Sequence, residues 1–266
     1  MTDSNAEATT AEAPAGDGAP ASRPKVIVVM PARQAAATLK QTVSEIPLDE
    51  VAEIILVDDS STDETVRLAR ELPLDVVWHP HQVGYGGNQK TCYMQALHQE
   101  ADVVVMLHPD GQYEPGLIPN MVQPIIDGRA DLVLGSRLAV PGAALAAGMP
   151  RWKFVANRFL TIIQNRIMGT HLTEAHTGYR AYSRELLLTV PFLRNSLDFS
   201  FDSELLYQAA HFGFRIEEVP ARCRYFEEAS SVGFKTGVVY GLKTVWAGIR
   251  LLLHRAGIWR SRKFQR

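Results

Sequence analysis

Five short apolar runs, rich in valine and isoleucine, punctuate the first half of the chain, and polar positions do not alternate within them. They cover residues 26–30, 54–57, 75–78, 102–107 and 131–134. Continuous apolar runs of this length are typical of strands that are buried on both faces of a largely parallel sheet. The pattern therefore predicts a sheet that is covered on both sides.

The segments between these runs have the character of helices. Residues 61–72, 88–99 and 116–126 are expected to be helical, and in the first of them Glu64 follows Ser61 by three positions, which is a capping-box pattern. The repeated order of strand, helix and strand predicts a doubly wound α/β core.

Polar or glycine-rich clusters follow the apolar runs, directly or after a short gap. They are Pro31–Gln34, Asp58–Ser61, the loop at Gly84, His108–Gln112 and Gly135–Arg137. In open α/β sheets, ligands bind in the crevice beyond the carboxyl ends of the strands. Surface loops are polar in any protein, but this does not explain why acids, glycines and one arginine recur there. We therefore expect a ligand site at this edge of the sheet.

Composition narrows the class of protein. The 266 residues, 46% of them apolar, suffice for one large α/β domain or two small ones, and the net charge of −2 gives no indication of nucleic-acid binding. Two cysteines, Cys92 and Cys223, are too few for a disulfide framework and fit reduced thiols in a cytosolic core. Residues 1–23 have the composition of a disordered tail and lack the apolar stretch of a signal peptide. No run reaches the roughly 18 to 20 apolar residues of a membrane span.

The stretch GYGGNQKT, residues 84–91, has the glycines and the lysine of a phosphate-binding loop. In a P-loop that starts at Gly84 the second glycine would fall on Gln89, so a nucleoside-triphosphate P-loop is not expected. The glycines, Gly86 among them, still allow close backbone approach to a ligand, and the following helix offers its N-terminus to an anion. Asn88 and Lys90 are placed to reach a nucleotide, although a flexible connection with a solvated lysine explains the stretch equally well.

Two acidic clusters follow the second and the fourth runs. Asp58 and Asp59 can accept hydrogen bonds from a nucleobase or a ribose, and since one acid suffices to cap the turn, at least one is expected to bind a ligand. In the second cluster, Asp110 and the Gln112 carbonyl offer the oxygen ligands that Mg²⁺ prefers. His108 either adds a nitrogen ligand, which suits Mn²⁺ better, or is a half-buried residue that ends a strand.

Five segments, in this order and spacing, resemble family 2 glycosyltransferases, and within them the dolichyl- and polyprenyl-phosphate sugar synthases. The segments are IILVDDSSTDET, VGYGGNQKT, VVVMLHPDGQYEP, LVLGSR and HTGYRAYSRE, and the resemblance covers roughly residues 25–230. It implies a GT-A fold, which is a Rossmann-like α/β/α sandwich with a mostly parallel sheet. It also implies inverting transfer from a nucleotide-diphosphate sugar with Mg²⁺ or Mn²⁺ as cofactor.

The resemblance also implies roles for individual residues. Asp110 matches the second acid of the family's D-x-D motif and Gln112 the metal-binding glutamine after it, while His108 stands where the first acid is usual. Arg137 matches an arginine near the phosphates. The nucleotide-sugar site would comprise Pro31, Ala32, Asp58, Asp59, Gly86, Asn88, Lys90 and Asp110. The catalytic set would comprise Asp110, Arg137, Glu174, Arg180, Asp202 and Glu204. Positions 33–34 depart from the usual Tyr-Asn pair, which leaves UDP- and GDP-linked donors both open.

The acceptor determines which further groups the reaction needs. A lipid phosphate is already anionic, so positioning would do most of the work, with Arg180, Arg222 or Arg224 holding the phosphate. A sugar hydroxyl would need a general base. The candidates are Glu174, His176, Asp202 and Glu204, although a local hydrogen bond or a helix cap also explains each of them.

The C-terminal stretch, residues 233–266, changes character. Apolar residues recur at helical spacing from Val238 to Leu252, and from Lys243 onward there are seven lysines or arginines and no acid. A basic amphipathic helix with interspersed tryptophans is typical of a membrane-surface element, and a helix packed on the catalytic domain with a solvated basic tail is the alternative. Residues 152–168 are similarly amphipathic and either dock on the same surface or cover the acceptor site.

Together these observations predict a disordered tail over residues 1–23, a GT-A domain over 24–232 and a basic amphipathic helix and tail over 233–266. The expected activity is transfer of a hexose from a UDP- or GDP-linked sugar to a polyprenyl phosphate. The protein would be cytoplasmic and peripherally associated with the inner face of a membrane, without a nucleic-acid partner. The alternatives are a saccharide or other hydroxyl acceptor, or a catalytically weak scaffold that binds nucleotide sugars.

Overall fold

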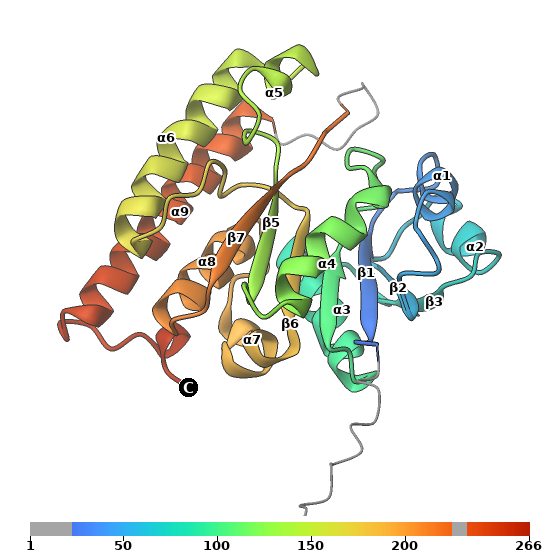
Figure 1. Ribbon diagram of the computed structural model, residues 1–266, viewed down its shortest axis with the longest axis horizontal. Helices are drawn as coiled ribbons and strands as arrows, with labels where there is room; N and C mark the ends of the chain where they lie inside the picture. The colour runs from blue at the N-terminus through green and yellow to red at the C-terminus, as the bar shows by residue number, and fades with distance from the viewer. Residues whose placement is uncertain (1–22, 225–232) are drawn as a thin grey trace, which may run out of the picture.

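A seven-stranded sheet forms the centre of the molecule, and helices cover both of its faces (Figure 1). The computed structural model describes residues 23–224 and 233–266. The strand order is β3-β2-β1-β4-β6-β5-β7, and only β6 runs antiparallel to its neighbours. The strands are β1 (Val26–Ala32), β2 (Glu53–Asp58), β3 (Asp75–Trp78), β4 (Val103–Met106), β5 (Leu132–Ser136), β6 (Arg180–Ser183) and β7 (Ile216–Pro220).

The two faces of the sheet carry separate hydrophobic cores. One core packs against α3 (Tyr85–His98), α7 (Arg184–Thr189) and α8 (Ser200–His211). The other packs against α1 (Leu39–Ser44), α2 (Thr65–Ala69) and α4 (Ile118–Ile126). Successive residues of β1 alternate between the two cores, and each buried side chain of this kind contributes about 1.5–3 kcal/mol. The α/β/α sandwich and the mostly parallel sheet are therefore confirmed.

The five apolar runs are confirmed as the strands β1 to β5, but the predicted burial on both faces is wrong for the edge strand β3, where Asp75 and Trp78 are exposed. The sequence did not predict β6 and β7. Both missed strands are short, and β7 carries two glutamates in the sequence IEEVP at one edge of the sheet. Their places in the sheet are set by pairing with β4 and β5. Their own residues therefore do not identify them as strands.

The predicted capping box at Ser61 and Glu64 is wrong. The helix here, α2, begins only at Thr65, and no side chain caps its N-terminus. The Ser61 hydroxyl instead accepts a hydrogen bond from the Gln34 backbone N–H at 2.8 Å, and the Ser61 N–H donates to Asp58. The polar groups that would cap a helix are used to join the loops that follow β1 and β2.

The remaining helices, α5 (Ala143–Ala146), α6 (Arg151–Met168) and α9 (Phe234–Arg255), build one end of the molecule. Three short 3-10 turns lie elsewhere along the chain: η1 (Pro115–Leu117), η2 (Phe192–Arg194) and η3 (Arg262–Phe264). Helices α6 and α9 lie side by side and run in the same direction (Figure 1), with Gly237 against Trp152 and Gly248 against Ile167. Within the described ranges, no helix is both long and apolar enough to cross a membrane.

The C-terminal residues are tied to the core. Phe264 is buried between His211 and His254, and Lys263 forms an ion pair with Glu204. The alternative of a solvated basic tail is therefore wrong for η3. The predicted disordered tail lies outside the described residues except for Arg23, which forms an ion pair with Glu50, and the predicted domain boundary at residue 232 lies in the other undescribed segment.

Candidate active site

A cavity of about 570 Å³ opens at the carboxyl edge of the sheet, where the sequence predicted a ligand site. Its polar end is formed by His108, Asp110 and Gln112 after β4, by Arg137 after β5 and by Asp202 in α8. These residues come from loops far apart in the sequence, and the structure brings all five to one cavity. The predicted metal ligands and three of the predicted catalytic residues, Asp110, Arg137 and Asp202, therefore share one site.

The opposite wall of this cavity is apolar and comes from α6 and α9. Trp152 and Leu160 of α6 and Gly237 and Gly241 of α9 line this wall, where the two helices pack against each other. A Cβ atom added at Gly237 would lie 3.7 Å from the Trp152 ring, and one at Gly241 would lie 3.4 Å from Leu160. Side chains larger than glycine at these two positions would therefore narrow the space between the helices.

At the polar end, Asp110 and Gln112 form a tight turn. The Asp110 carboxylate accepts a hydrogen bond from the Gln112 N–H at 3.0 Å, and the Gln112 main-chain carbonyl accepts one from the Arg224 N–H at 2.8 Å. The main-chain carbonyl of Gln112, one of the oxygens considered as a metal ligand, is therefore used within the fold. Both residues also line the cavity, and their side chains carry the carboxylate and amide oxygens that a hard cation prefers.

His108 is packed tightly at the same corner. Its ring is stacked beside the ring of Tyr85, with Nε2 3.4 Å from the Tyr85 hydroxyl. A Cβ atom at Gly178 would come within 2.9 Å of this imidazole. Any side chain at this position of the HTGYR segment would therefore clash with His108. In the described part of the chain, no three His, Cys, Asp or Glu side chains gather as a metal site would need. One carboxylate with an amide and an imidazole fits a cation that takes its other ligands from a diphosphate and water.

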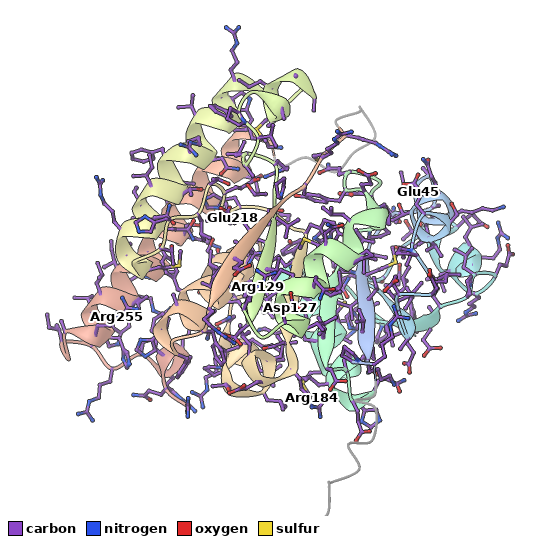
Figure 2. The ribbon with its side chains drawn as sticks, in the orientation of Figure 1. Glu45, Asp127, Arg129, Arg184, Glu218 and Arg255 are labelled. Atoms are coloured by element: carbon purple, nitrogen blue, oxygen red, sulfur yellow. The ribbon has the colours of Figure 1, made fainter. Side chains whose placement is uncertain are left out.

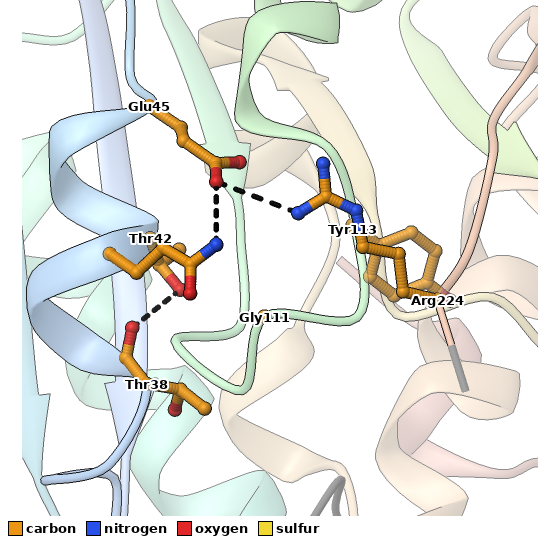
Figure 3. A pocket seen from close by; sticks show the side chains of 7 residues that line it. Thr38, Thr42, Glu45, Gly111, Tyr113 and Arg224 are labelled. Atoms are coloured by element: carbon orange, nitrogen blue, oxygen red, sulfur yellow. Dashed lines mark hydrogen bonds and ion pairs between the residues drawn. The ribbon is translucent and has the colours of Figure 1, made fainter. Parts of the chain in front are cut away.

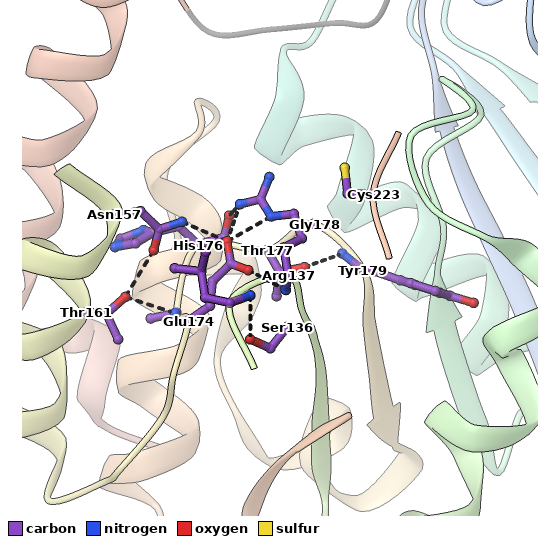
Figure 4. Close-up of polar contacts among 12 residues, drawn as sticks. Ser136, Arg137, Asn157, Thr161, Glu174, His176, Thr177, Gly178, Tyr179 and Cys223 are labelled. Atoms are coloured by element: carbon purple, nitrogen blue, oxygen red, sulfur yellow. Dashed lines mark hydrogen bonds and ion pairs between the residues drawn. The ribbon is translucent and has the colours of Figure 1, made fainter. Parts of the chain in front are cut away.

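Arg137 is held in place by Glu174 (Figure 4). The Glu174 carboxylate accepts hydrogen bonds from the Arg137 backbone N–H at 2.7 Å and from Nε at 2.9 Å, and Asn157 donates to it at 2.7 Å. Burial alone would raise the pKa of Glu174, but the Arg137 charge and these hydrogen bonds lower it below its usual range. Glu174 is fully buried and does not line the cavity. Its prediction as a general base is therefore corrected: it is a permanently charged group that positions Arg137.

The loop that carries Glu174 is fixed in turn by Glu218 of β7 (Figure 2). The Glu218 carboxylate accepts hydrogen bonds from the backbone N–H groups of Thr173 at 2.6 Å and Glu174 at 2.8 Å. The glutamate that made β7 hard to recognise thus supports the ion pair at the cavity.

Arg180 does not reach the cavity, and its prediction as a phosphate-binding residue is corrected. Its side chain is 1% exposed and lies with the core that packs on α3 and α8. All three of its guanidinium nitrogens donate to backbone carbonyls, namely to Thr177 at 2.8 Å, Asp202 at 3.0 Å and Ala175 at 3.3 Å. Arg180 therefore ties the start of β6 to α8.

Arg222 and Arg224 also lie outside this cavity. Arg222 is exposed. Arg224 borders a separate pocket of about 260 Å³ beside α1, where its guanidinium is 3.5 Å from the Glu45 carboxylate (Figure 3). Neither arginine lines the cavity that Arg137 lines.

Of the acidic pair in α8, only Asp202 lines the cavity. Its carboxylate accepts hydrogen bonds from the Tyr85 hydroxyl at 2.7 Å and from the Gln89 side-chain amide at 3.1 Å. Burial, and then the nearby Asp202 charge, raise the pKa of Tyr85 well above its usual range, so its hydroxyl stays protonated. Glu204 accepts hydrogen bonds from the Ser196 N–H at 2.7 Å and pairs with Lys263. It anchors the C-terminal turn, and its prediction as a catalytic group is corrected.

The acids after β2 have different roles. Asp59 accepts hydrogen bonds from the backbone N–H groups of Val83 at 2.8 Å and Gly84 at 3.0 Å and lies 3.2 Å from His79, so it holds the loop before α3. Asp58 accepts one bond from the Ser61 N–H at 2.8 Å, while its other oxygen, Oδ1, is buried with no partner in residues 23–224 and 233–266. A buried unpaired oxygen is costly, but Asp58 and Asp59 are both buried and do not line the cavity, so their nucleotide contact stays a prediction.

The glycine-rich stretch mainly supports the fold. A Cβ atom at Gly86 would lie 2.4 Å from the Ser196 carbonyl, and Lys90 donates to the Asn195 carbonyl. Asn88 donates to the carbonyls of Ala32 at 3.3 Å and Val57 at 3.0 Å, which joins the ends of β1 and β2. Gly86 and Lys90 thus bind α3 to the loop before α8, which corrects their expected contact with a nucleotide. Pro31 and Ala32 end β1 beside β2, and their nucleotide contact stays a prediction, as does that of Asn88.

Sequence reasoning missed Lys153, which projects into the cavity from α6. It is half-buried, and no hydrogen bond or ion pair engages its ammonium group among the residues the structure describes. Burial, and then the neighbouring Arg137 charge, lower its pKa. The amphipathic pattern of residues 152–168 predicts a basic helix. It does not show that Lys153 lines the cavity whereas Arg158 and Arg166 are exposed.

Comparison with known proteins gives a family. The family model described as Glycosyl transferase family 2 matches residues 27–190. A UDP-N-acetylglucosamine–dolichyl-phosphate N-acetylglucosaminyltransferase of Methanococcus voltae is 28% identical over 249 residues, which are 87% of this chain and 96% of the relative. An undecaprenyl-phosphate mannosyltransferase of Micrococcus luteus is 28% identical over 86% of this chain and 99% of its own.

Solved structures give the same fold. Glucosyl-3-phosphoglycerate synthase from Mycobacterium tuberculosis, crystallised with Mn²⁺, UDP and phosphoglyceric acid, matches with a TM-score of 0.64. The match covers 90% of this chain and 80% of that chain at 21% sequence identity. At this level of identity the likeness establishes the shared architecture.

Proposed function

Because the chain belongs to glycosyltransferase family 2, and is therefore a glycosyltransferase, we propose that it transfers a hexose from a nucleotide-diphosphate sugar to a polyprenyl phosphate. One observation carries the proposal. A single cavity is lined by the metal-type group of His108, Asp110 and Gln112, by the two cations Arg137 and Lys153, and by apolar residues of α6 and α9. These three kinds of lining would suit, respectively, a sugar diphosphate, an acceptor phosphate and a hydrocarbon chain.

The donor end would hold the nucleotide diphosphate and its cation. Asp110, the Gln112 side chain and His108 are the groups that would bind Mg²⁺ or Mn²⁺. A divalent cation supplies charge stabilisation to a departing diphosphate when it is bound. Arg137 adds a fixed positive charge near the same oxygens, and Glu174 keeps its guanidinium oriented before the substrate arrives.

The acceptor end would hold a phosphate between Arg137 and Lys153. The two cations line one cavity, and the Arg137 charge adds to burial in lowering the pKa of Lys153, so an arriving anion would relieve this repulsion. An acceptor phosphate is anionic at neutral pH, so attack on the sugar carbon needs alignment and no strong base. The carbon chain would leave the phosphate between Trp152, Leu160 and the glycines of α9.

The outer surface of α6 and α9 would rest on a membrane. Large apolar side chains there that are exposed to solvent and do not line the cavity include Val155, Ile162, Val239 and Trp246. Val155 is 65% exposed and Val239 is 52% exposed. Exposed arginines and lysines, including Arg151, Arg158 and Lys243, accompany them. An apolar face with basic residues around it suits the surface of an anionic bilayer, which we take to be the cytoplasmic face of the membrane.

Asp202 favours a second candidate, transfer to a saccharide hydroxyl. Its carboxylate faces the cavity and is the group that could accept the proton of such an acceptor. The donor base, uracil or guanine, also stays a question for experiment, because Asp58 Oδ1 can accept a hydrogen bond from either.

The test is a product assay with the purified full-length chain. UDP- and GDP-sugars that shift its melting temperature in the presence of Mn²⁺ or Mg²⁺ are offered with polyprenyl phosphate in detergent or with soluble oligosaccharides. The proposal expects a lipid-phosphate-linked hexose. Glycosylated oligosaccharide with no lipid product would support transfer to a saccharide hydroxyl, with Asp202 as the proton acceptor, and would overturn the proposal.

A further inference from the structure

His176 occupies a junction between Arg137 and the helix α9. Its imidazole lines the cavity, and its Nδ1 lies 2.7 Å from the Tyr240 hydroxyl of α9. Its main-chain carbonyl accepts a hydrogen bond from the Arg137 guanidinium at 3.0 Å. The orientation of this ring is therefore tied to the cation of the site on one side and to the C-terminal helix on the other.

The other ring nitrogen, Nε2, is buried and has no hydrogen-bond partner in the part of the chain that the structure describes. A buried polar atom without a partner is a cost that folded proteins seldom retain unless a ligand or a bound water satisfies it. Since the ring lines the cavity where an acceptor phosphate would lie, a ligand oxygen is the natural partner for this atom.

The protonation of Nε2 depends on what Tyr240 does. The Tyr240 hydroxyl is 3.1 Å from Ser203 Oγ, which is 3.0 Å from Thr244 Oγ1. If each hydroxyl donates to the next, Thr244 to Ser203, Ser203 to Tyr240 and Tyr240 to His176, then Nδ1 accepts and Nε2 carries the hydrogen. Burial raises the pKa of Tyr240, which keeps its hydroxyl protonated and able to donate.

From this geometry we infer that Tyr240 holds His176 as the Nε2–H tautomer, and that His176 donates this hydrogen to the phosphate of the acceptor. The inference rests on the proposed function and adds a directional hydrogen bond to the charges of Arg137 and Lys153. It also makes the seating of α9 a condition for phosphate binding, because Tyr240 belongs to that helix.

The electrostatic surroundings agree with a neutral ring. The pKa of His176 is lowered to about 3, mainly by burial; the Glu174 charge opposes this shift, and the charges of Arg180 and Arg137 add to it. A neutral imidazole has one hydrogen and one lone pair, so the tautomer decides whether it can donate to an anion.

Kinetics separate this role from a structural one. His176→Ala should lower kcat/KM for polyprenyl phosphate by roughly tenfold to a hundredfold, the usual effect of losing a hydrogen bond to a charged group, and leave donor affinity unchanged. His176→Gln, whose amide N–H can take the place of Nε2–H, should recover much of the loss. Tyr240→Phe should give an intermediate loss. Tyr207→Phe is its matched control, since the buried Tyr207 hydroxyl also packs against α9 but has no hydrogen-bond partner among the described residues.

The tautomer can be read directly by ¹⁵N NMR of the histidine-labelled full-length chain at pH 7, with His176→Gln identifying the signal. The expected result is a protonated Nε2 in the wild type and a mixture of tautomers in Tyr240→Phe. An Nδ1–H ring, a charged ring, or wild-type acceptor kinetics in His176→Ala would overturn the inference. Absence of any lipid product from the wild type would instead refute the proposed function, and the NMR result would still decide the tautomer.

Discussion

The two ends of the cavity are built in different ways. The donor end stands on loops at the ends of β4 and β5, where Asp110 and Arg137 are fixed by short hydrogen bonds to neighbouring backbone and carboxylate groups. The acceptor end stands on α6 and α9, whose outer faces leave Val155 and Val239 exposed to solvent. Changes at the first end should therefore remove the chemistry for every acceptor, whereas changes at the second should affect only lipid substrates.

The largest effect is expected from Asp110→Asn. The substitution keeps the size of the side chain but removes the carboxylate that would bind the cation, and turnover should fall by about 10²–10³-fold. Donor consumption with Mn²⁺ or Mg²⁺ is the measurement, and Asp127→Asn on the surface is the control. Near-normal turnover in Asp110→Asn would place the donor chemistry elsewhere.

A second prediction contrasts two arginines. Arg137→Lys should lower turnover by roughly tenfold to a hundredfold, because a lysine keeps the charge but loses the forked geometry. Arg180→Lys should instead destabilise the fold, by about 1–3 kcal/mol for backbone carbonyls left unpaired in the core, as denaturant unfolding would measure. The reverse pattern would mean that Arg180 binds substrate.

Lys153→Met tests the middle of the cavity. It keeps the length of the side chain and removes the charge, so KM for polyprenyl phosphate should rise about tenfold, as for the loss of one charge-assisted hydrogen bond. Donor affinity should stay the same. Arg166→Met, on the exposed face of the same helix, is the matched control. An equal rise in both variants would point to general attraction to the lipid surface and not to a phosphate site.

The outer face of the helices should matter only at a membrane. The double substitution Val155→Ser and Val239→Ser removes two exposed apolar side chains that do not line the cavity, and binding to vesicles of anionic lipid should weaken by about tenfold. Activity on a short-chain, water-soluble prenyl phosphate should not change. Sedimentation with vesicles measures the first quantity, and unchanged sedimentation would refute the docking face.

The smallest effect concerns pH. His176 is neutral in the fold because burial lowers its pKa to about 3, whereas it takes up a proton near pH 6.5 when unfolded. Its folded-state pKa is depressed, so this cost is absent above pH 6.5 and grows as the pH falls from there towards 3. Between pH 7 and pH 5 the wild type should lose about 2 kcal/mol that His176→Gln does not lose. Equal pH dependence of unfolding in the two proteins would show that the ring is charged or exposed.

The sequence predicted the framework better than the site. Long apolar runs can only be buried strands, and for this reason β1, β2 and β4 and the position of the ligand edge were recognisable. The prediction of individual site residues failed where the direction of a side chain decides its role. Arg137 and Arg180 both lie at the carboxyl edge, but the side chain of Arg180 shares its face of β6 with Tyr182 and points into a core. The four-residue sequence RAYS gives no alternation from which this could be read.

The same reason explains Glu174, Glu204 and Lys153. The sequence does not show which residue a charged side chain will pair with. Glu174 and Glu204 pair with residues that lie 37 and 59 positions away in the chain. Lys153 became visible only when α6 was placed over the cavity. Packing between distant segments, and not local pattern, decides which charges are left for a substrate.

The most direct test of the account is the product formed by the full-length chain from a nucleotide sugar, a divalent cation and polyprenyl phosphate. Mass spectrometry should find a hexose linked through the lipid phosphate, with its anomeric configuration inverted relative to the donor, and Asp110→Asn should not form it. Free sugar or a glycosylated oligosaccharide as the only product, with the lipid phosphate unchanged, would contradict the assignment of the cavity to a lipid phosphate acceptor.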